Sequence, residues 1–218
     1  MSAVANEKAK GQKYILPDCG VMNRFWDEIG FDYELEGIAE TTKEIEPHDD
    51  PWICGIYDKD LPRRFAETCC EILNPQPMKG VHVVIIQRTV MNGYENQPAK
   101  FAQAGGERRW IQNMKEVFEV CEKYEHTRID YLENKTLKEQ IELFMSASAI
   151  VIQHGASFFN TVFCKPNTPV IEITRNNYFQ KPAKWFGVNR LPCQYGNTQK
   201  SAVVNLDDLE GLVVQNLT

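Results

Sequence analysis

Residues 146–173 contain the side chains that are best placed to do chemistry in this chain. The apolar, β-branched run at 149–152 is typical of a parallel strand that is buried on both faces, and Gln153 separates it from His154. A second apolar run at 170–173 contains a single acid, Glu172. Ligands of open α/β sheets bind at the carboxyl ends of the strands. We therefore expect His154 and Glu172 at the mouth of such a crevice.

The turn between the two runs favours a phosphate-bearing ligand. His154 is followed by Gly155, Ala156 and Ser157, and residues 157–164 predict a short helix that ends before the strand at 170–173. Small residues let the backbone approach a ligand closely. The start of a helix offers N–H groups and a positive dipole end to an anion. This pattern indicates a site for a nucleotide or a nucleotide-sugar.

Each candidate side chain has a functional and a structural interpretation. His154 could donate to a diphosphate or take part in proton transfer, or it could be a structural histidine bonded to backbone. An unpaired carboxylate is costly inside an apolar strand, so Glu172 must bond a ribose hydroxyl, a neighbouring arginine or a helix N-terminus. Arg88 and Arg109 suit phosphate binding, because a guanidinium grips two oxygens at once. Alternatively, each lies on a solvated face or pairs with a carboxylate.

Composition narrows the class of protein. The chain has 218 residues, 43% of them hydrophobic and 25% charged, which is ordinary for a globular protein. Its net charge of −6 argues against a general electrostatic grip on nucleic acid or anionic lipid. We expect no membrane span and no signal peptide, and hence a cytoplasmic protein. The seven cysteines form no CxxC pair, which favours buried, reduced thiols over a metal site.

The second half of the chain alternates strands with helices. Strands are predicted at 81–86 and 127–132, and helices at 109–124, from Thr136 to about Met145, and at 206–214. Thr136 and Glu139 form a capping box for the second of these helices. This rhythm predicts an α/β fold with a Rossmann-like parallel, doubly wound sheet and right-handed crossovers.

The first half is expected to be a smaller unit. Its strands are predicted at 13–16 and 52–57 and its helices at 22–29 and 61–73, the latter with Pro62 in the first turn. Residues 74–77 contain two prolines and read as a linker. We therefore divide the chain into a flexible tail at 1–12, a small N-terminal α/β portion at 13–77 and a Rossmann-like nucleotide-sugar-binding domain at 78–218.

Four sequence motifs occur in a fixed order along residues 80–175. A strand ends in Arg88, and Arg109-Trp110-Ile111-Gln112-Asn113 and Gln140-Ile141 follow it. The fourth is His154-Gly155-Ala156-Ser157-Phe158-Phe159-Asn160, with Phe163, Pro166 and Val170-Ile171-Glu172-Ile173 behind it. Together they resemble glycosyltransferase family 61, which includes plant xylosyl- and arabinosyltransferases and animal O-linked GlcNAc transferases. Ser157, Phe158 and Phe159 depart from the Gly-Leu-Thr of that family's motif.

The resemblance implies an inverting transfer of a sugar from a UDP-sugar to a glycan or protein hydroxyl. It also implies a GT-B-type fold with a small or reduced N-terminal portion, and neither a bound metal nor a cofactor. Matched residue by residue, the catalytic positions are His154 and Arg88. The donor-binding positions form a larger set, namely Arg109, Asn113, Gly155, Ala156, Ser157, Asn160 and Glu172.

Other functions remain open at this point. Asp58 and Asp60 mimic the DxD motif of metal-dependent GT-A transferases. A transferase-like module could instead bind a nucleotide, a sugar or a partner without turnover. Self-association is compatible with a domain that has a single lobe. The general base is not singled out by the sequence. Its candidates are Asp or Glu residues of the N-terminal half, among them Asp18, Asp58 and Asp60.

Overall fold

The computed structural model describes nine stretches of the chain, which are residues 14–17, 24–30, 33–36, 60–80, 83–86, 110–124, 127–132, 135–198 and 201–217. Its contacts divide the chain into two compact units, 1–74 and 75–218, and each is described by itself.

The first unit contains two strands and two helices in its described residues. Strands β1 (Tyr14–Pro17) and β2 (Tyr33–Glu36) pair in parallel, and the helices are α2 (Arg24–Glu28) and α3 (Leu61–Leu73). The predicted bounds of α3 are confirmed, with the proline in its first turn. It ends where Asn74 takes a left-handed φ of 44°.

Two details of the first unit differ from the sequence prediction. Helix α2 ends at Glu28 rather than at the predicted residue 29, and β2 was not predicted. The glutamates of β2 alternate with Tyr33 and Leu35, and so short an alternation also occurs in loops. The strand predicted at 52–57 lies outside the described residues.

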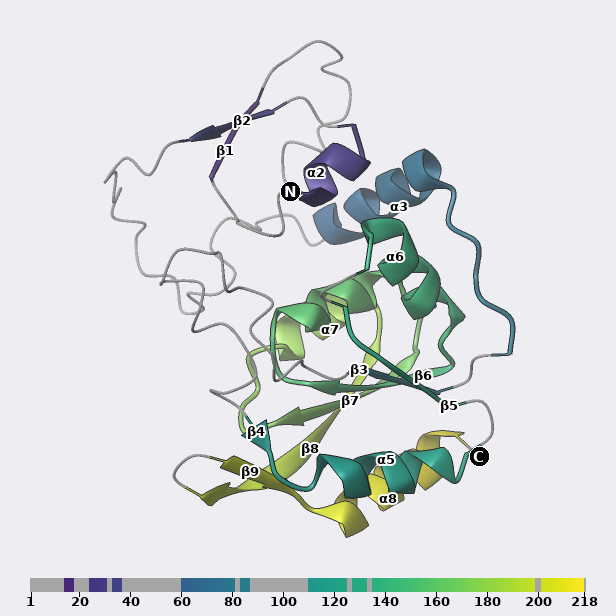
Figure 1. Cartoon of the computed structure of the whole chain (residues 1–218), viewed down its shortest axis with the longest axis vertical. Helices are drawn as coiled ribbons and strands as arrows, with labels where there is room; N and C mark the ends of the chain where they lie inside the picture. Colours follow the sequence, from purple (N-terminus) through teal and green to yellow (C-terminus); the bar gives the residue numbers. More distant parts are fainter. Residues whose placement is uncertain are drawn as a thin grey trace. The chain divides into compact units, whose positions relative to one another are not determined.

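The second unit contains a seven-stranded sheet with helices on both faces (Figure 1). Its strands are β3 (Val83–Ile86), β4 (Trp110–Ile111), β5 (Thr127–Asp130), β6 (Ala149–Gln153), β7 (Pro169–Thr174), β8 (Asn189–Thr198) and β9 (Ser201–Val204). Its helices are α5 (Met114–Glu122), α6 (Leu137–Ser146), the 3-10 helix η3 (Ala156–Phe163), α7 (Gln180–Phe186) and α8 (Leu206–Leu217). The strand order is β4-β9-β8-β7-β6-β3-β5.

The sheet is mostly parallel. Strands β5, β3, β6, β7 and β8 pair in parallel, and β8 with β9 is the antiparallel pair. The α/β class is therefore confirmed, while the prediction of a parallel sheet is wrong for the β8–β9 pair. Two residues separate β8 from β9 in the sequence, and so short a connection can join only antiparallel neighbours.

Strand order reverses between β3 and β6. The chain first adds β5 on one side of β3 and then adds β6, β7 and β8 on the other side. Right-handed crossovers then require the helices to change face, as observed: α5 and α8 lie on one side of the sheet and α6 and α7 on the other (Figure 1). Such a reversal is where open α/β sheets bind ligands, at the carboxyl ends of the strands.

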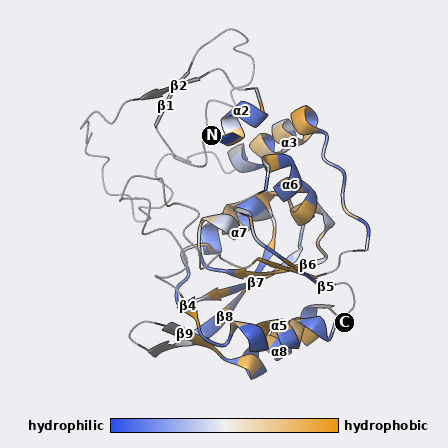
Figure 2. Ribbon diagram, in the orientation of Figure 1, coloured by the Kyte–Doolittle hydropathy of each residue, from blue (hydrophilic) through white to orange (hydrophobic). Residues whose placement is uncertain are grey.

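The core lies between the sheet and its helices. Val151, Ile171 and Ile173 are completely buried and belong to the cluster that includes residues of α5 and α8. Neighbouring residues along each strand face α6, η3 and α7 because side chains alternate across a sheet. Hydrophobic residues colour much of the central strands in Figure 2, as expected for strands covered on both faces.

One predicted helix begins later than expected. Residues 110–111 form strand β4, paired with Ser201 and Ala202 of β9, and α5 starts only at Met114. The partner strand is distant in sequence, so local periodicity does not reveal it. The capping box of Thr136 and Glu139 and the closing helix α8 are confirmed.

None of the described helices is long and apolar enough to cross a bilayer. The division into tail, N-terminal portion and nucleotide-sugar-binding domain stays a prediction, as does the GT-B type of the fold.

Candidate active site

His154 lies where the central strand β6 ends. Its backbone N–H donates to Ile173 O over 3.0 Å, so the chain stays paired with β7 one residue beyond the strand. Ile152 is in register with Glu172. Because side chains alternate, His154 and Glu172 point to the same face of the sheet. The structure brings them together, with His154 Nδ1 2.5 Å from Glu172 Oε1.

Glu172 is shared between two basic side chains. It is completely buried, and its second oxygen, Oε2, accepts a hydrogen bond from Arg190 Nε. Arg190 stands on β8 opposite Val170, two positions from Glu172 on the same face, and its side chain is 6% exposed. Of the interpretations offered for Glu172, the structure shows the bond to an arginine. Its contact with donor stays a prediction.

Arg190 also holds the loop that follows β7. Its Nη2 donates to Asn176 O over 2.8 Å, and its Nη1 lies 3.4 Å from Asn177 Oδ1. Tyr178 N in turn donates to Asn176 Oδ1 over 3.1 Å. One guanidinium therefore connects the carboxylate beside His154 to the β7–α7 loop.

Aromatic rings pack against the imidazole. The Phe179 ring centroid lies 4.7 Å from that of His154, and Phe158 stacks on Phe179 at 4.6 Å with 5° between the planes. Phe158 is fully buried. Tyr178 is 50% exposed with its ring 6.0 Å from His154. The imidazole thus lies between a dry aromatic cluster and an exposed tyrosine.

The charges of this cluster balance when the imidazole is neutral. Arg190 carries one positive charge and Glu172 one negative charge, whereas a charged His154 would leave a net positive charge among largely buried groups. A carboxylate only accepts hydrogen bonds, so the proton of a neutral imidazole belongs on Nδ1. Nε2, on the opposite side of the ring, then has the lone pair.

The turn after His154 is buried at its start and open further on. Gly155 is buried with φ 161° and ψ −176°, an extended conformation that any residue adopts. Its carbonyl accepts from Phe158 N and begins η3. Ala156 is exposed and Ser157 half-buried. The predicted roles of these three residues in donor binding stay predictions.

Two amide residues of the predicted site are engaged within the protein. Asn160 Nδ2 donates to Gln140 Oε1 over 2.8 Å and so joins η3 to α6. Asn113 Nδ2 donates to Val204 O over 2.8 Å and its Oδ1 accepts from Val204 N over 2.9 Å. In the structure, Asn160 therefore connects η3 to α6, and Asn113 connects the start of α5 to β9. Their parts in donor binding stay predictions.

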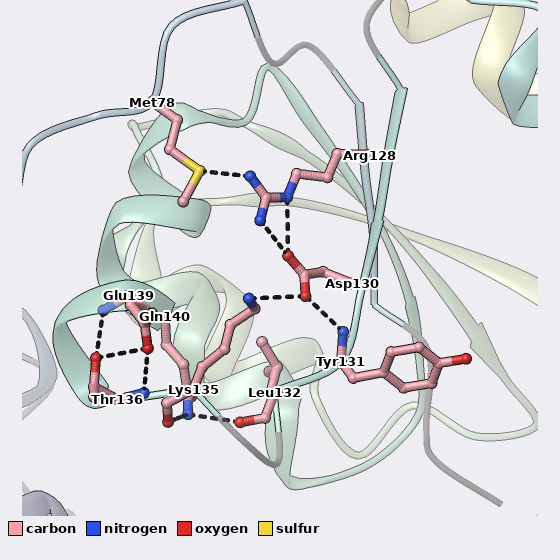
Figure 3. A network of polar contacts seen from close by, with 9 residues as sticks. All are labelled: Met78, Arg128, Asp130, Tyr131, Leu132, Lys135, Thr136, Glu139 and Gln140. Atoms are coloured by element: carbon pink, nitrogen blue, oxygen red, sulfur yellow. Dashed lines mark hydrogen bonds and ion pairs between the residues drawn. The ribbon is translucent and has the colours of Figure 1, made fainter.

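A second polar network lies where β5 ends (Figure 3). Asp130 Oδ2 accepts from Arg128 Nε and pairs with its Nη2, at 2.9 and 2.8 Å. Its Oδ1 accepts from Lys135 Nζ and from Tyr131 N, both over 2.9 Å. Two cations thus neutralise one carboxylate here, and the sequence analysis did not single them out.

Several predicted residues lie outside the described residues. They are Arg88, Arg109, Asp18 and Asp58. Asp60, the partner of Asp58 in the DxD reading, is exposed and stands immediately before α3. Among the described residues, no group of three or more His, Cys, Asp or Glu side chains is placed to hold a metal ion.

A comparison with known protein families identifies the family of this chain. The family model described as Glycosyltransferase 61 matches residues 43–171, more than half of the chain. The chain belongs to glycosyltransferase family 61. A curated relative, the beta-1,2-xylosyltransferase RCN11 of Oryza sativa subsp. japonica, is 23% identical to this family 61 chain over 172 residues. These cover 75% of the chain but 31% of the relative, so the chain spans about a third of that protein's length.

The family match includes the predicted catalytic positions Arg88 and His154 and ends one residue before Glu172. Arg190 lies beyond it, and the sequence analysis missed this residue together with the loop at 175–179. A signal existed, since a buried acid requires a compensating cation. No local sequence pattern identified which arginine supplies this cation.

Proposed function

We propose that this family 61 chain binds a UDP-sugar and transfers its sugar to a hydroxyl of a glycan or protein, with inversion and without a bound metal. The observation that carries the proposal is the position of His154. It follows β6, one of the two strands between which strand order reverses, and its imidazole is oriented by a buried carboxylate.

The donor diphosphate needs positive charge and N–H donors as it departs. In this proposal Arg88 and Arg109 supply the charge, and the N–H groups of Ala156 and Ser157 at the start of η3 supply donors. Arg88 follows β3, the other strand at the reversal, by two positions in the sequence. The match of both arginines to the family motif supports this assignment.

Nucleotide binding is the first test. We expect UDP and UDP-sugars to raise the melting temperature of the full chain, with UDP-xylose tried first because the curated relative is a xylosyltransferase. Arg88→Ala and Arg109→Ala should each weaken UDP binding about tenfold or more, since each removes charge-assisted hydrogen bonds. Arg128→Met, which alters the Asp130 network of β5 and removes neither proposed phosphate contact, is the control. A melting temperature unchanged by every nucleotide would contradict the proposal.

Turnover is the second test. His154→Gln is expected to lower the rate of UDP release by about 10²- to 10⁴-fold, the range for a group that moves a proton. Transfer should persist in EDTA and show inverted anomeric configuration by NMR of the product. Activity that requires manganese would favour the DxD alternative instead.

A further inference from the structure

We propose that Arg190 is a positioning residue that acts through Glu172 to hold His154 as the neutral Nδ1–H tautomer, so that Nε2 accepts the proton of the attacking hydroxyl. This inference rests on the proposed function for its chemical step, but the tautomer itself can be tested without turnover.

The geometry supplies the order of the three side chains. Glu172 lies between His154 and Arg190, with Oε1 toward the imidazole and Oε2 toward the guanidinium. Since each oxygen has its own partner, the carboxylate is held from two sides and cannot rotate without breaking one bond. Arg190 therefore fixes the orientation of His154 without touching it.

Charge then selects the tautomer. Arg190 pairs with one oxygen of Glu172, so the carboxylate already has a cation beside it and its other oxygen needs only a hydrogen-bond donor from the imidazole. Other charged or titratable groups near the ring are few in the described residues. Tyr178 faces it from the β7–α7 loop, η3 contains no ionisable side chain, and Lys181 and Lys184 are exposed on α7. Nδ1 therefore donates to Glu172 and Nε2 is the basic nitrogen.

The chemical step follows directly. The acceptor hydroxyl oxygen attacks the anomeric carbon while its proton passes to His154 Nε2. The bond from that carbon to the diphosphate oxygen breaks, and UDP leaves with the electron pair. Attack opposite the leaving group inverts the configuration. His154 thereby fills the role of general base, for which the sequence had offered Asp18, Asp58 and Asp60.

Imidazole nitrogen NMR tests the tautomer. In the full chain we expect His154, assigned by comparison with His154→Gln, to give the Nδ1–H pattern at pH 7.5. Glu172→Gln should replace it with the Nε2–H pattern, because a glutamine amide can donate to Nδ1. Arg190→Met should shift both nitrogen signals. An imidazolium or Nε2–H pattern in the wild-type chain, or unchanged signals in Arg190→Met, would overturn the proposal.

Controls separate positioning from general damage. Arg128→Met removes a comparable arginine–carboxylate pair from β5 of the same sheet and should leave the His154 signals unchanged. Arg190→Lys keeps a charge beside Glu172 and should retain the Nδ1–H pattern. If Arg190→Met does not fold, Arg190→Gln removes the charge with less loss of bonding and should still shift the signals.

Kinetics test the route through Glu172. Arg190→Met should lower kcat about 10- to 100-fold, as loss of an outer partner of a functional histidine does, with little change in KM for the donor. In the Glu172→Gln background, Arg190→Met should lower kcat by less than about twofold, because the two residues act as one unit. Fully additive effects of Arg190→Met and Glu172→Gln on kcat would overturn the positioning role of Arg190. Inactivity of the wild-type chain with an intact Nδ1–H pattern would contradict the proposed transferase function alone.

Discussion

Asn160 and Gln140 are joined by a hydrogen bond of 2.8 Å that connects η3 to α6. Gln140 is 3% exposed, and its Nε2 also donates to Leu132 O and Lys135 O over 3.1 and 3.2 Å. Both N–H groups of the amide and its oxygen are thus bonded to segments that follow β5 and β6. The two residues singled out separately in the sequence form one brace.

The brace predicts a stability cost for either partner. Gln140→Leu removes the bonds from Gln140 Nε2 to Leu132 O and Lys135 O and the acceptor of Asn160 Nδ2, and it should lower the free energy of unfolding by about 1–3 kcal/mol. Urea unfolding followed by circular dichroism measures this. Gln215→Ala, an exposed change on α8, should stay within about 0.5 kcal/mol of wild type. Equal effects of the two variants would argue against the brace.

The capping box of α6 predicts a pH-dependent contribution. The backbone N–H and the hydroxyl of Thr136 donate to Glu139 and hold the pKa of that carboxyl below its ordinary value of 4.5. A lowered folded-state pKa stabilises the fold at pH values above the unfolded pKa, and this stabilisation is lost as the pH falls through the folded pKa. Glu139→Gln should therefore be less stable than wild type at pH 7, with the difference vanishing in acid.

Two variants complete the capping test. Thr136→Ala removes the cap itself and should cost about 1 kcal/mol at pH 7. Glu71→Gln, at an exposed position inside α3, provides the control for loss of a glutamate charge. Denaturant midpoints at pH 7 and pH 3 supply the comparison. A constant gap between Glu139→Gln and wild type across this range would refute the linkage.

Asn113 is expected to stabilise the β9 edge. Its amide makes a reciprocal pair of bonds with the backbone of Val204, so Asn113→Ala should increase hydrogen exchange at the Val204 amide and cost about 1–3 kcal/mol. We expect UDP affinity to follow stability and otherwise remain unchanged. A selective loss of UDP affinity in a fully stable variant would instead assign Asn113 to the donor, as the family motif implies.

The buried thiols should be slow to react. Burial raises the pKa of Cys69 and Cys121 to about 12 and that of Cys193 to about 11, with smaller contributions from neighbouring groups. At pH 8 their thiolate fractions are then on the order of one part in a thousand or less. Mass spectrometry after iodoacetamide treatment should show them unlabelled in the native chain and labelled in urea. Rapid native labelling of Cys121 would contradict the burial described here.

The five described cysteines form no disulfide with one another, and their reduced state stays a prediction. The expected burial is confirmed for Cys69, Cys121, Cys164 and Cys193, while Cys70 is half-buried.

Much of the second unit was predictable because its signals are local. The runs that form β3, β6 and β7 are apolar without alternation, as strands buried on both faces must be, and the capping box of α6 is contained within four residues. The position of His154 at the end of β6 followed from the same reasoning. Each of these features depends on residues that are close together in the sequence.

The sequence by itself determined that a histidine ends a buried strand and that an acid is buried in the next one. Only the tertiary structure decided that Arg190 neutralises that acid, that residues 110–111 form a strand and that Asn113 and Asn160 act as braces. The physical reason is the same in all these cases. An ion pair, a strand pairing or a side-chain bond depends on which segments become neighbours in space, and local composition does not encode that choice.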